Sequence, residues 1–319
     1  MTRALITGIT GQDGSYLAEL LLDKGYEVHG LLHGSAEGPF ERLESVADRI
    51  TLHPGDILDE HSLVGVLRRA SPDEVYNLAA MSSVAESWRL AVATAEYTAV
   101  GVTRLLEGIR EACPEARFYQ ASSSEMFGRA RETPQSEATP FYPRSPYGVA
   151  KAYGHFITVN YRESFGLHAS SGILFNHESP RRPQSFVSRR ISRGVARIKL
   201  GLADELVLGD LDVRRDWGYA KEYVEAMWLM LQQPEAGDYV IGTGVSHSVR
   251  DMVDVAFGCV DLEADDYVRV DPALARPADI EELVADAAKA RRKLGWDPRT
   301  PFEELVEMMV RADLEALGR

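Results

Sequence analysis

The segment Arg3-Ala-Leu-Ile-Thr-Gly-Ile-Thr-Gly-Gln-Asp-Gly14 places three glycines at three-residue intervals directly after a short apolar run. Residues 3–7 are predicted to form a buried strand, residues 8–14 a turn, and residues 15–24 a helix, because apolar residues recur there at helical spacing. Glycines in such a turn let the backbone approach a pyrophosphate, and the following helix offers free N–H groups to it. Plain turns also use glycine, but the flanking strand and helix favour a dinucleotide-binding turn.

Strand and helix patterns alternate through the first half of the chain. Further strands are predicted at 27–32, 50–53, 74–77 and 117–121, with helices at 60–71 and 91–112. This alternation predicts an α/β fold with a doubly wound parallel (Rossmann) sheet. The pattern is less regular after about residue 170. We therefore expect a cofactor-binding Rossmann domain at 1–170 and a smaller C-terminal α/β region at 171–319 that mainly binds substrate, with some segments returning to the sheet.

Composition excludes several classes of partner. The 319-residue chain carries a formal net charge of −14, so its surface field repels nucleic acid and anionic membrane, and a phosphate-bearing ligand must be held by local arginines. The two cysteines and eight histidines show no metal-ligand or disulfide spacing. No leader or membrane-spanning run is apparent, so we expect a cytoplasmic protein without a metal site. The proline-dense stretch 133–146 is expected to be an ordered loop or a flap.

The residues after the second strand bear on which dinucleotide is bound. An acidic residue there would bind a ribose 2′-hydroxyl and favour NAD, but the sequence reads His33-Gly34-Ser35, with Arg42 further on. This pattern favours NADP and leaves NAD open. Asp56 with Ile57 could hold the adenine or lie in a solvated loop. The small residues of Leu78-Ala-Ala80 could pass close to a cofactor or serve tight sheet packing.

Candidate catalytic residues follow the strand predicted at 117–121. Tyr147 and Lys151 stand four residues apart, on one face of a helix that begins beside Pro146. An ammonium near a phenol is expected to lower the tyrosine pKa towards a value useful for acid or base catalysis. Upstream, Ser122-Ser-Ser-Glu125 leaves the carboxyl end of the strand, where open parallel sheets bind ligands. A serine-rich cap of the next element is the alternative interpretation.

Taken together, these segments resemble the extended short-chain dehydrogenase/reductases, and among them the GDP-mannose 4,6-dehydratase family. The resemblance is carried by the turn at 8–14, by Tyr147 with Lys151, and by the run at 140–148. It extends over nearly the whole chain, through the runs at 174–182, 214–217, 223–231 and 270–277. It implies conversion of GDP-mannose to GDP-4-keto-6-deoxymannose, with a hydride moved internally from C4 to C6 and water lost.

The resemblance also implies roles for individual residues. Tyr147 would take the proton of the sugar 4-hydroxyl with support from Lys151, Glu125 would act as acid and base at C5 and O6, and Ser123, where the family usually has threonine, would hydrogen-bond the 4-oxygen. The implied cofactor-binding residues are Gly8, Thr10, Gly11, Gln12, Asp13, Gly14, Arg42, Asp56, Ile57, Leu78, Ala79, Ala80, Tyr147, Lys151, His177 and Arg182. The implied substrate-binding residues are Ser82, Glu125, Asn176, Val187, Arg190, Arg215 and Arg276.

The chain departs from the family pattern at a few positions. His33 and Gly34 replace an arginine pair that in the family reads the 2′-phosphate and helps to build a tetramer, so the expected assembly is a homodimer or a homotetramer. Met81 and Ser83 replace a glutamine and a histidine beside the site. One alternative is a GDP-4-keto-6-deoxy-sugar reductase or epimerase on the same scaffold, and another is a non-enzymatic NAD(P)-sensing protein. Glu125 favours dehydration over reduction, and Tyr147 with Lys151 favours an enzyme over a sensor.

Overall fold

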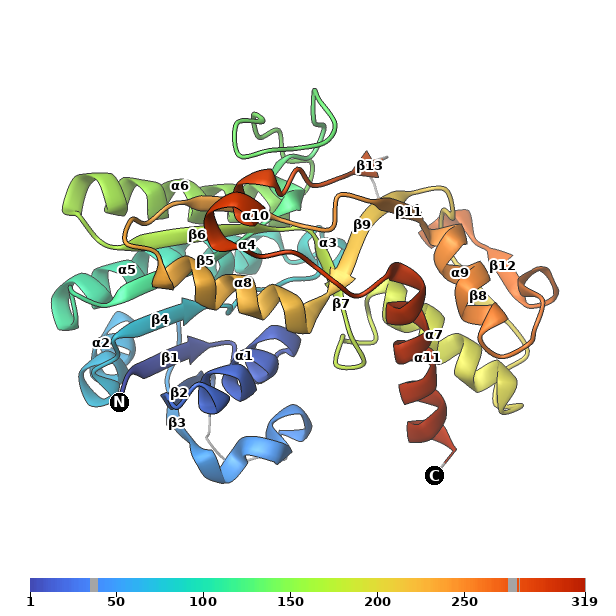
Figure 1. Cartoon of the computed structure of the whole chain (residues 1–319), viewed down its shortest axis with the longest axis horizontal. Coiled ribbons are helices and arrows are strands. Elements are labelled where there is room, and N and C mark those ends of the chain that lie inside the picture. The colour runs from blue at the N-terminus through green and yellow to red at the C-terminus, as the bar shows by residue number, and fades with distance from the viewer. Residues whose placement is uncertain (35–39, 275–279, 281, 319) are drawn as a thin grey trace.

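A seven-stranded parallel sheet forms the centre of the molecule (Figure 1). The computed structural model describes residues 1–34, 40–274, 280 and 282–318. The strand order is β10-β6-β5-β4-β1-β2-β3, and all six neighbouring pairs are parallel. The strands are β1 (Arg3–Thr7), β2 (Glu27–Leu32), β3 (Ile50–Pro54), β4 (Glu74–Asn77), β5 (Arg117–Ser123), β6 (Ala169–Leu174) and β10 (Asp238–Ile241). The predicted doubly wound parallel sheet is therefore confirmed.

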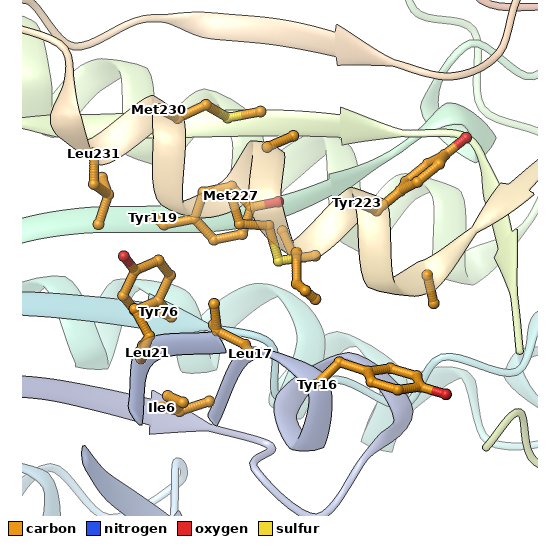
Figure 2. Close-up of a cluster of buried hydrophobic side chains, with 14 of the residues drawn as sticks. Ile6, Tyr16, Leu17, Leu21, Tyr76, Tyr119, Tyr223, Met227, Met230 and Leu231 are labelled. Carbon is orange, nitrogen blue, oxygen red and sulfur yellow. The ribbon is translucent and has the colours of Figure 1, made fainter. Parts of the chain in front are cut away.

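Helices cover both faces of this sheet. One face carries η1 (Glu41–Arg49) and the helices α1 (Gln12–Asp23), α8 (Ala220–Gln232) and α10 (Ala288–Leu294). The other carries α2 (Glu60–Ala70), α5 (Gly101–Ala112) and α6 (Pro146–Phe165). Figure 2 shows α1 and α8 packed over the strands through buried side chains that include Leu17, Leu21, Tyr76, Tyr119, Met227 and Met230. Each such aliphatic side chain stabilises the fold by about 1.5–3 kcal/mol.

A smaller lobe lies beside the carboxyl ends of the strands, at the right of Figure 1. Its core is formed by α7 (Val187–Lys199), α9 (Val249–Gly258) and α11 (Phe302–Leu317). Two short sheets complete it, one of β7 (Asn176–Glu178), β9 (Arg214–Tyr219), β11 (Ser246–Ser248) and β13 (Glu282–Leu283), the other of β8 (Leu206–Leu208) and β12 (Val268–Val270). The chain after residue 170 also contributes α8, β10 and α10 to the main sheet's layers. The boundary between the predicted domains stays a prediction.

Two predicted helices differ from the structure in their bounds. The first begins at Gln12 rather than residue 15, because Gly11 takes the extended N-cap conformation and Gly14 lies within the first helical turn. The helix predicted at 91–112 is divided into α4 (Ala91–Ala95), the π-helical turn η2 (Glu96–Val100) and α5. The remaining short elements are α3 (Val84–Ser87), η3 (Ser124–Met126), η4 (Ala264–Asp266) and η5 (Pro272–Leu274).

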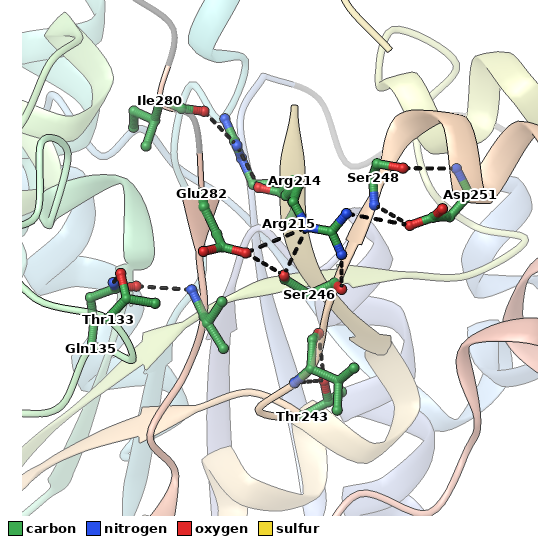
Figure 3. A network of polar contacts seen from close by, with 12 residues as sticks. Thr133, Gln135, Arg214, Arg215, Thr243, Ser246, Ser248, Asp251, Ile280 and Glu282 are labelled. Atoms are coloured by element: carbon green, nitrogen blue, oxygen red, sulfur yellow. Dashed lines mark hydrogen bonds and ion pairs between the residues drawn. The ribbon is translucent and has the colours of Figure 1, made fainter. Parts of the chain in front are cut away.

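The proline-dense loop is fixed to the C-terminal segment of the chain through Gln135, which is fully buried. Its backbone N–H donates to the Val284 carbonyl, its carbonyl accepts from Asp286, and its side-chain oxygen accepts from the Val284 N–H. Figure 3 places Gln135 beside the strand that carries Glu282. The loop is therefore an ordered one.

None of the described helices combines the length and the apolar character needed to cross a bilayer.

Candidate active site

A cavity of about 690 Å³ opens between the carboxyl ends of the central strands and the smaller lobe. One predicted site residue within the described part of the chain, Arg42, is not part of its lining, and another, Arg276, lies outside the described residues. The structure brings the others together on its wall: Gly8, Thr10, Gly11, Gln12, Asp13, Gly14, Asp56, Ile57, Leu78, Ala79, Ala80, Ser82, Ser123, Glu125, Tyr147, Lys151, Asn176, His177, Arg182, Val187, Arg190 and Arg215. Their roles stay predictions.

The glycine turn between β1 and α1 is shaped by backbone contacts that leave no room for a Cβ. Gly8 has a φ of +69°, and a Cβ there would lie 2.9 Å from the Ala79 nitrogen. A Cβ on Gly14 would lie 2.3 Å from the Gly8 carbonyl oxygen. Gly11 caps α1 without a side-chain hydrogen bond, which leaves the N–H groups of the first turn available to an anion. These residues fit the diphosphate of a dinucleotide.

His33 and Asp56 line the cavity where β2 and β3 end. The His33 Nδ1 lies 3.6 Å from Asp56 Oδ1, and the His33 side chain is 69% exposed. Arg42 takes no part in this lining, because its Nε donates to the Arg181 carbonyl at 2.8 Å and its Nη1 to the Thr10 carbonyl at 3.4 Å. The structure thus places Arg42 as a support of the turn.

Tyr147 and Lys151 reach the cavity from the first turns of α6. Ser145 caps this helix by accepting from the Gly148 N–H at 3.0 Å, and Pro146 stands at its first position. The Lys151 Nζ donates to the Ala121 carbonyl at 2.8 Å and lies 5.7 Å from the Tyr147 ring centroid. The two side chains therefore lie near one another, and their cooperation in catalysis stays a prediction.

The expected effect of Lys151 on the Tyr147 pKa is wrong for this structure. Burial raises the Tyr147 pKa to about 12, and the Ser123 hydroxyl offsets this only in part. Burial also lowers the Lys151 pKa to about 8, against the opposing effect of Asp13. Desolvation, which disfavours the charged form of both groups, outweighs the favourable pair that sequence spacing suggested.

Ser123, the last residue of β5, and Glu125, in the η3 turn that follows, line the same cavity. The Ser123 Oγ accepts from the Glu125 N–H at 3.2 Å, which caps the short turn η3. A Cβ on Gly148 would lie 2.7 Å from the Glu125 carbonyl oxygen, so this glycine lets α6 pack directly against η3. Burial is the largest influence on the Tyr147 pKa, and the Glu125 charge raises it further, so these two groups are electrostatically coupled.

Two arginines of the cavity, Arg182 and Arg215, are held by named partner groups. The buried Arg215 donates from Nη1 to the Ile280 carbonyl at 2.8 Å and to the Arg214 carbonyl at 2.7 Å (Figure 3). The Arg182 Nε lies 3.0 Å from Glu178 Oε2, and its guanidinium lies 3.8 Å from the Phe186 ring centroid. Arg190 is exposed at the cavity wall. Two of the three guanidinium groups are thus oriented by fixed partners.

Sequence reasoning missed the residues that orient Arg182. Glu178 is buried, lines the cavity, and also accepts from the Ser188 hydroxyl at 2.5 Å. A carboxylate four residues before an arginine that is predicted to bind an anion was the available signal. Phe186 gave none, because an aromatic residue near an arginine is common in any chain.

Comparisons with known proteins agree with this geometry. The family model described as GDP-mannose 4,6 dehydratase matches residues 5–309. GDP-mannose 4,6 dehydratase 1 of Arabidopsis thaliana is 51% identical, over 99% of this chain and 91% of the relative. The GDP-mannose 4,6 dehydratase of Homo sapiens is 48% identical, over 98% of this chain and 92% of the relative.

Among solved structures, a dTDP-glucose 4,6-dehydratase from Streptomyces venezuelae with NAD and TYD bound superposes with a TM-score of 0.89. It is 25% identical in sequence and covers 99% of this chain and 98% of its own. Its fold and the glycine turn identify the chain as one of the NAD(P)-binding dehydratase and epimerase enzymes. From the family model and the extent of both sequence matches, the chain belongs to the GDP-mannose 4,6-dehydratase family.

Proposed function

We propose that this protein converts GDP-D-mannose to GDP-4-keto-6-deoxy-D-mannose, with a nicotinamide dinucleotide as the internal hydride carrier. One observation carries the proposal: a single cavity is lined by Tyr147, Lys151 and Glu125 and also by the glycine turn, whose backbone fits a diphosphate. Family membership supports the same substrate and the same loss of water.

The chain's own residues account for the proton transfers. A bound nicotinamide dinucleotide supplies a site that stores the C4 hydride and returns it to C6. Tyr147 takes the proton of the sugar 4-hydroxyl, and Ser123, whose hydroxyl lowers the Tyr147 pKa against the larger effect of burial, steadies the deprotonated form. Lys151 stays fixed to the Ala121 carbonyl and supplies positive charge beside the phenol.

Glu125 is the proposed acid and base for dehydration. Once C4 is a ketone, the C5 hydrogen is acidic, and the Glu125 carboxylate removes it. The same proton then passes to O6, which leaves as water. After hydride reaches C6, C5 takes up one proton, and release of the proton that Tyr147 took from the 4-hydroxyl balances this uptake, so both residues return to their starting forms. Because η3 packs directly on α6, Glu125 keeps a fixed position relative to Tyr147 throughout.

NADP is the proposed dinucleotide, with NAD as the alternative. Within the described residues, the segment that directly follows β2, residues 33–34, offers His33 and no acidic residue, which favours a 2′-phosphate. Asp56, 3.6 Å from His33, is the feature that favours NAD, because its carboxylate repels a phosphate. Fluorescence titrations of the purified protein with NADPH and with NADH decide between them, because the preferred dinucleotide has the lower dissociation constant.

We also propose that the protein is a homo-oligomer that pairs through α6. Val149, Tyr153 and Phe156 share one face of this helix and are 56%, 43% and 59% exposed. Large apolar groups gathered on one helix face favour burial against a second copy. In analytical ultracentrifugation, a Phe156→Glu variant should sediment as a smaller species than the wild type. The mass of the wild-type species distinguishes a dimer from a tetramer.

A cytoplasmic location is proposed on the two cysteines. Cys113 and Cys259 are both free thiols, as suits a reducing compartment. Fractionation of cells that express the protein tests this.

The decisive experiment incubates the protein with GDP-mannose and no added reductant. The expected result is a product lighter by one water in the mass spectrum. Glu125→Gln should lower the rate by about 100- to 10,000-fold, whereas the control Glu163→Gln, at an exposed position of α6, should not. An unchanged substrate mass, with turnover only when NADPH and a 4-keto sugar are supplied, would favour the reductase alternative.

A further inference from the structure

His177 of β7 is held between two oxygen atoms beside the glycine turn. Its Nδ1 lies 2.7 Å from the Phe175 carbonyl oxygen, and its Nε2 lies 2.8 Å from Asp13 Oδ2. The ring is buried and stacks on Tyr223 at a centroid distance of 4.8 Å. Neither ring nitrogen therefore has a free direction in which to bind another group.

These partners determine the protonation of the imidazole. A carbonyl oxygen only accepts hydrogen bonds, so Nδ1 carries a hydrogen. An ionised carboxylate also only accepts, so Nε2 carries one too, and the ring is an imidazolium. Burial opposes the charge on Asp13, but the contact with His177 outweighs it and lowers the Asp13 pKa to about 2. The pair is therefore an ion pair at neutral pH.

Asp13 occupies an unfavourable place for a bare negative charge. It lies in the first turn of α1 and lines the cavity where the free N–H groups attract an anion. A carboxylate there repels a diphosphate. The positive charge of His177, in direct contact, offsets this repulsion.

The same pair connects the glycine turn to the smaller lobe. The Gln12 amide donates to Asp13 Oδ1 at 3.0 Å and to the His177 carbonyl at 3.1 Å. The Ser179 hydroxyl donates to Gln12 Oε1 at 2.8 Å. This network fixes the N-terminus of α1 against β7 and the loop that follows it.

We propose that Asp13 and His177 form a positioning unit for the dinucleotide, in which His177 is kept as an imidazolium so that Asp13 can hold the turn without repelling the diphosphate. The unit acts through the turn and through charge, since both imidazole nitrogens are already used. The inference rests on the proposed use of a dinucleotide and assigns a pH dependence to its binding.

The groups that face His177 set the direction of that dependence. They are Asp13 from α1, Arg182 from the loop after β7, the Tyr223 ring from α8 and the Phe175 carbonyl. The neighbouring Glu178 is committed to Ser188 and Arg182. Burial lowers the His177 pKa, but Asp13 outweighs it and the pKa lies above its usual 6.5. Affinity for the dinucleotide should therefore hold below pH 6.5 and fall as pH rises through the raised pKa.

The test measures binding of reduced dinucleotide to the ligand-free protein, by fluorescence titration between pH 6 and 9. A simple charge argument predicts that Asp13→Asn binds more tightly. The proposal predicts weaker binding, by about tenfold at neutral pH, with the pH dependence flattened. His177→Asn should weaken binding more than the double variant Asp13→Asn/His177→Asn does, because only the single variant leaves the negative charge of Asp13 without a positive partner.

Two controls separate this role from a merely structural one. Glu19→Gln removes a carboxylate from the same helix, where it pairs with Arg181 away from the cavity lining, and should leave the pH profile unchanged. The NMR signal of a His177 ring carbon can be assigned because it is missing in His177→Asn. Its titration should give a pKa above 6.5 in the wild type and a lower pKa in Asp13→Asn.

Equal or tighter binding by Asp13→Asn with an unchanged pH profile would overturn the proposal, as would a His177 that titrates below 6.5. These measurements contain no sugar. If the binding results contradict the proposal but GDP-mannose still loses water, the proposed function stands and the positioning unit is refuted. If binding is as expected but no water is lost, only the proposed function is refuted.

Discussion

The two walls of the cavity are built on different physical principles. The wall around the glycine turn owes its shape to backbone atoms in contact, with Gly8 and Gly14 leaving no space for a methyl group. The opposite wall owes its chemistry to guanidinium groups. Arg215 is oriented by the Ile280 carbonyl from a distant segment, and Arg182 by the carboxylate of Glu178, four residues earlier. The first wall is therefore fixed by backbone atoms in contact, and the second by the hydrogen bonds and ion pairs of side chains.

This difference predicts how each wall fails. Closely packed backbone atoms cannot shift slightly to make room for a side chain. One added methyl group should therefore abolish dinucleotide binding. A side-chain wall loses one hydrogen bond at a time, and its losses should be graded. The variants below test this contrast in order of expected effect.

Gly14→Ala should have the largest effect. Its Cβ would lie 2.3 Å from the Gly8 carbonyl oxygen and 2.5 Å from the Ile9 Cα, so the turn itself must open. We expect dinucleotide affinity to fall by about 100-fold or more, since overpacking costs about 1–3 kcal/mol and the binding geometry is lost as well. Fluorescence titration measures it.

The matched control is Gly258→Ala, at the end of α9, where a Cβ meets nothing within 4 Å. It should bind the dinucleotide normally and unfold at the same or a slightly higher temperature. Retained affinity in a folded Gly14→Ala protein would refute the contrast between the walls.

The wall around the glycine turn could be predicted from sequence because its glycines stand close together in the chain. Gly8, Gly11 and Gly14 stand between one strand and one helix, and the same reasoning located Tyr147 and Lys151 on a single helix face. It failed on the Tyr147 pKa, because spacing shows that a lysine is near but not how deeply both groups are buried. The distant partner of Arg215 was beyond it, since Arg215 and Ile280 lie far apart in the chain and are brought together by the pairing of β9 and β13.

Arg215→Lys tests the second wall directly. A lysine keeps the charge but cannot present two parallel donors to a diphosphate while also bonding the Ile280 carbonyl. We expect KM for GDP-mannose to rise by about 10- to 100-fold, with dinucleotide affinity unchanged. Arg214→Lys is the control, because its guanidinium binds Ser246 on the neighbouring strand and is not part of the cavity lining (Figure 3). Equal effects from both variants would show that β9 matters only for stability.

Gln135→Ala should act on the same wall from a greater distance. Its side chain and backbone hold residues 284 and 286, just after the β13 strand that pairs with Arg215. Loss of the side-chain acceptor should let that strand move, and we expect KM for GDP-mannose to rise by about tenfold with kcat and dinucleotide affinity little changed. Gln233→Ala, whose amide donates only within the end of α8, is the comparison. A fall in kcat without a change in KM would contradict a positioning role.

Phe186→Leu should have the smallest effect. The Phe186 ring lies under the Arg182 guanidinium at 3.8 Å, and leucine keeps most of the apolar contact while removing the attraction between ring and cation. That attraction contributes about 0.5–1 kcal/mol at a partly exposed site, so the dissociation constant of the dinucleotide, which Arg182 is predicted to bind, should rise by about two- to fivefold. Phe165→Leu is a matched control, because Arg110 lies over that ring at 5.2 Å away from the cavity lining. A graded series from Arg215 to Phe186, beside an abrupt loss at Gly14, would establish that the two walls differ in kind; a loss at Phe186 as complete as that at Gly14 would contradict it.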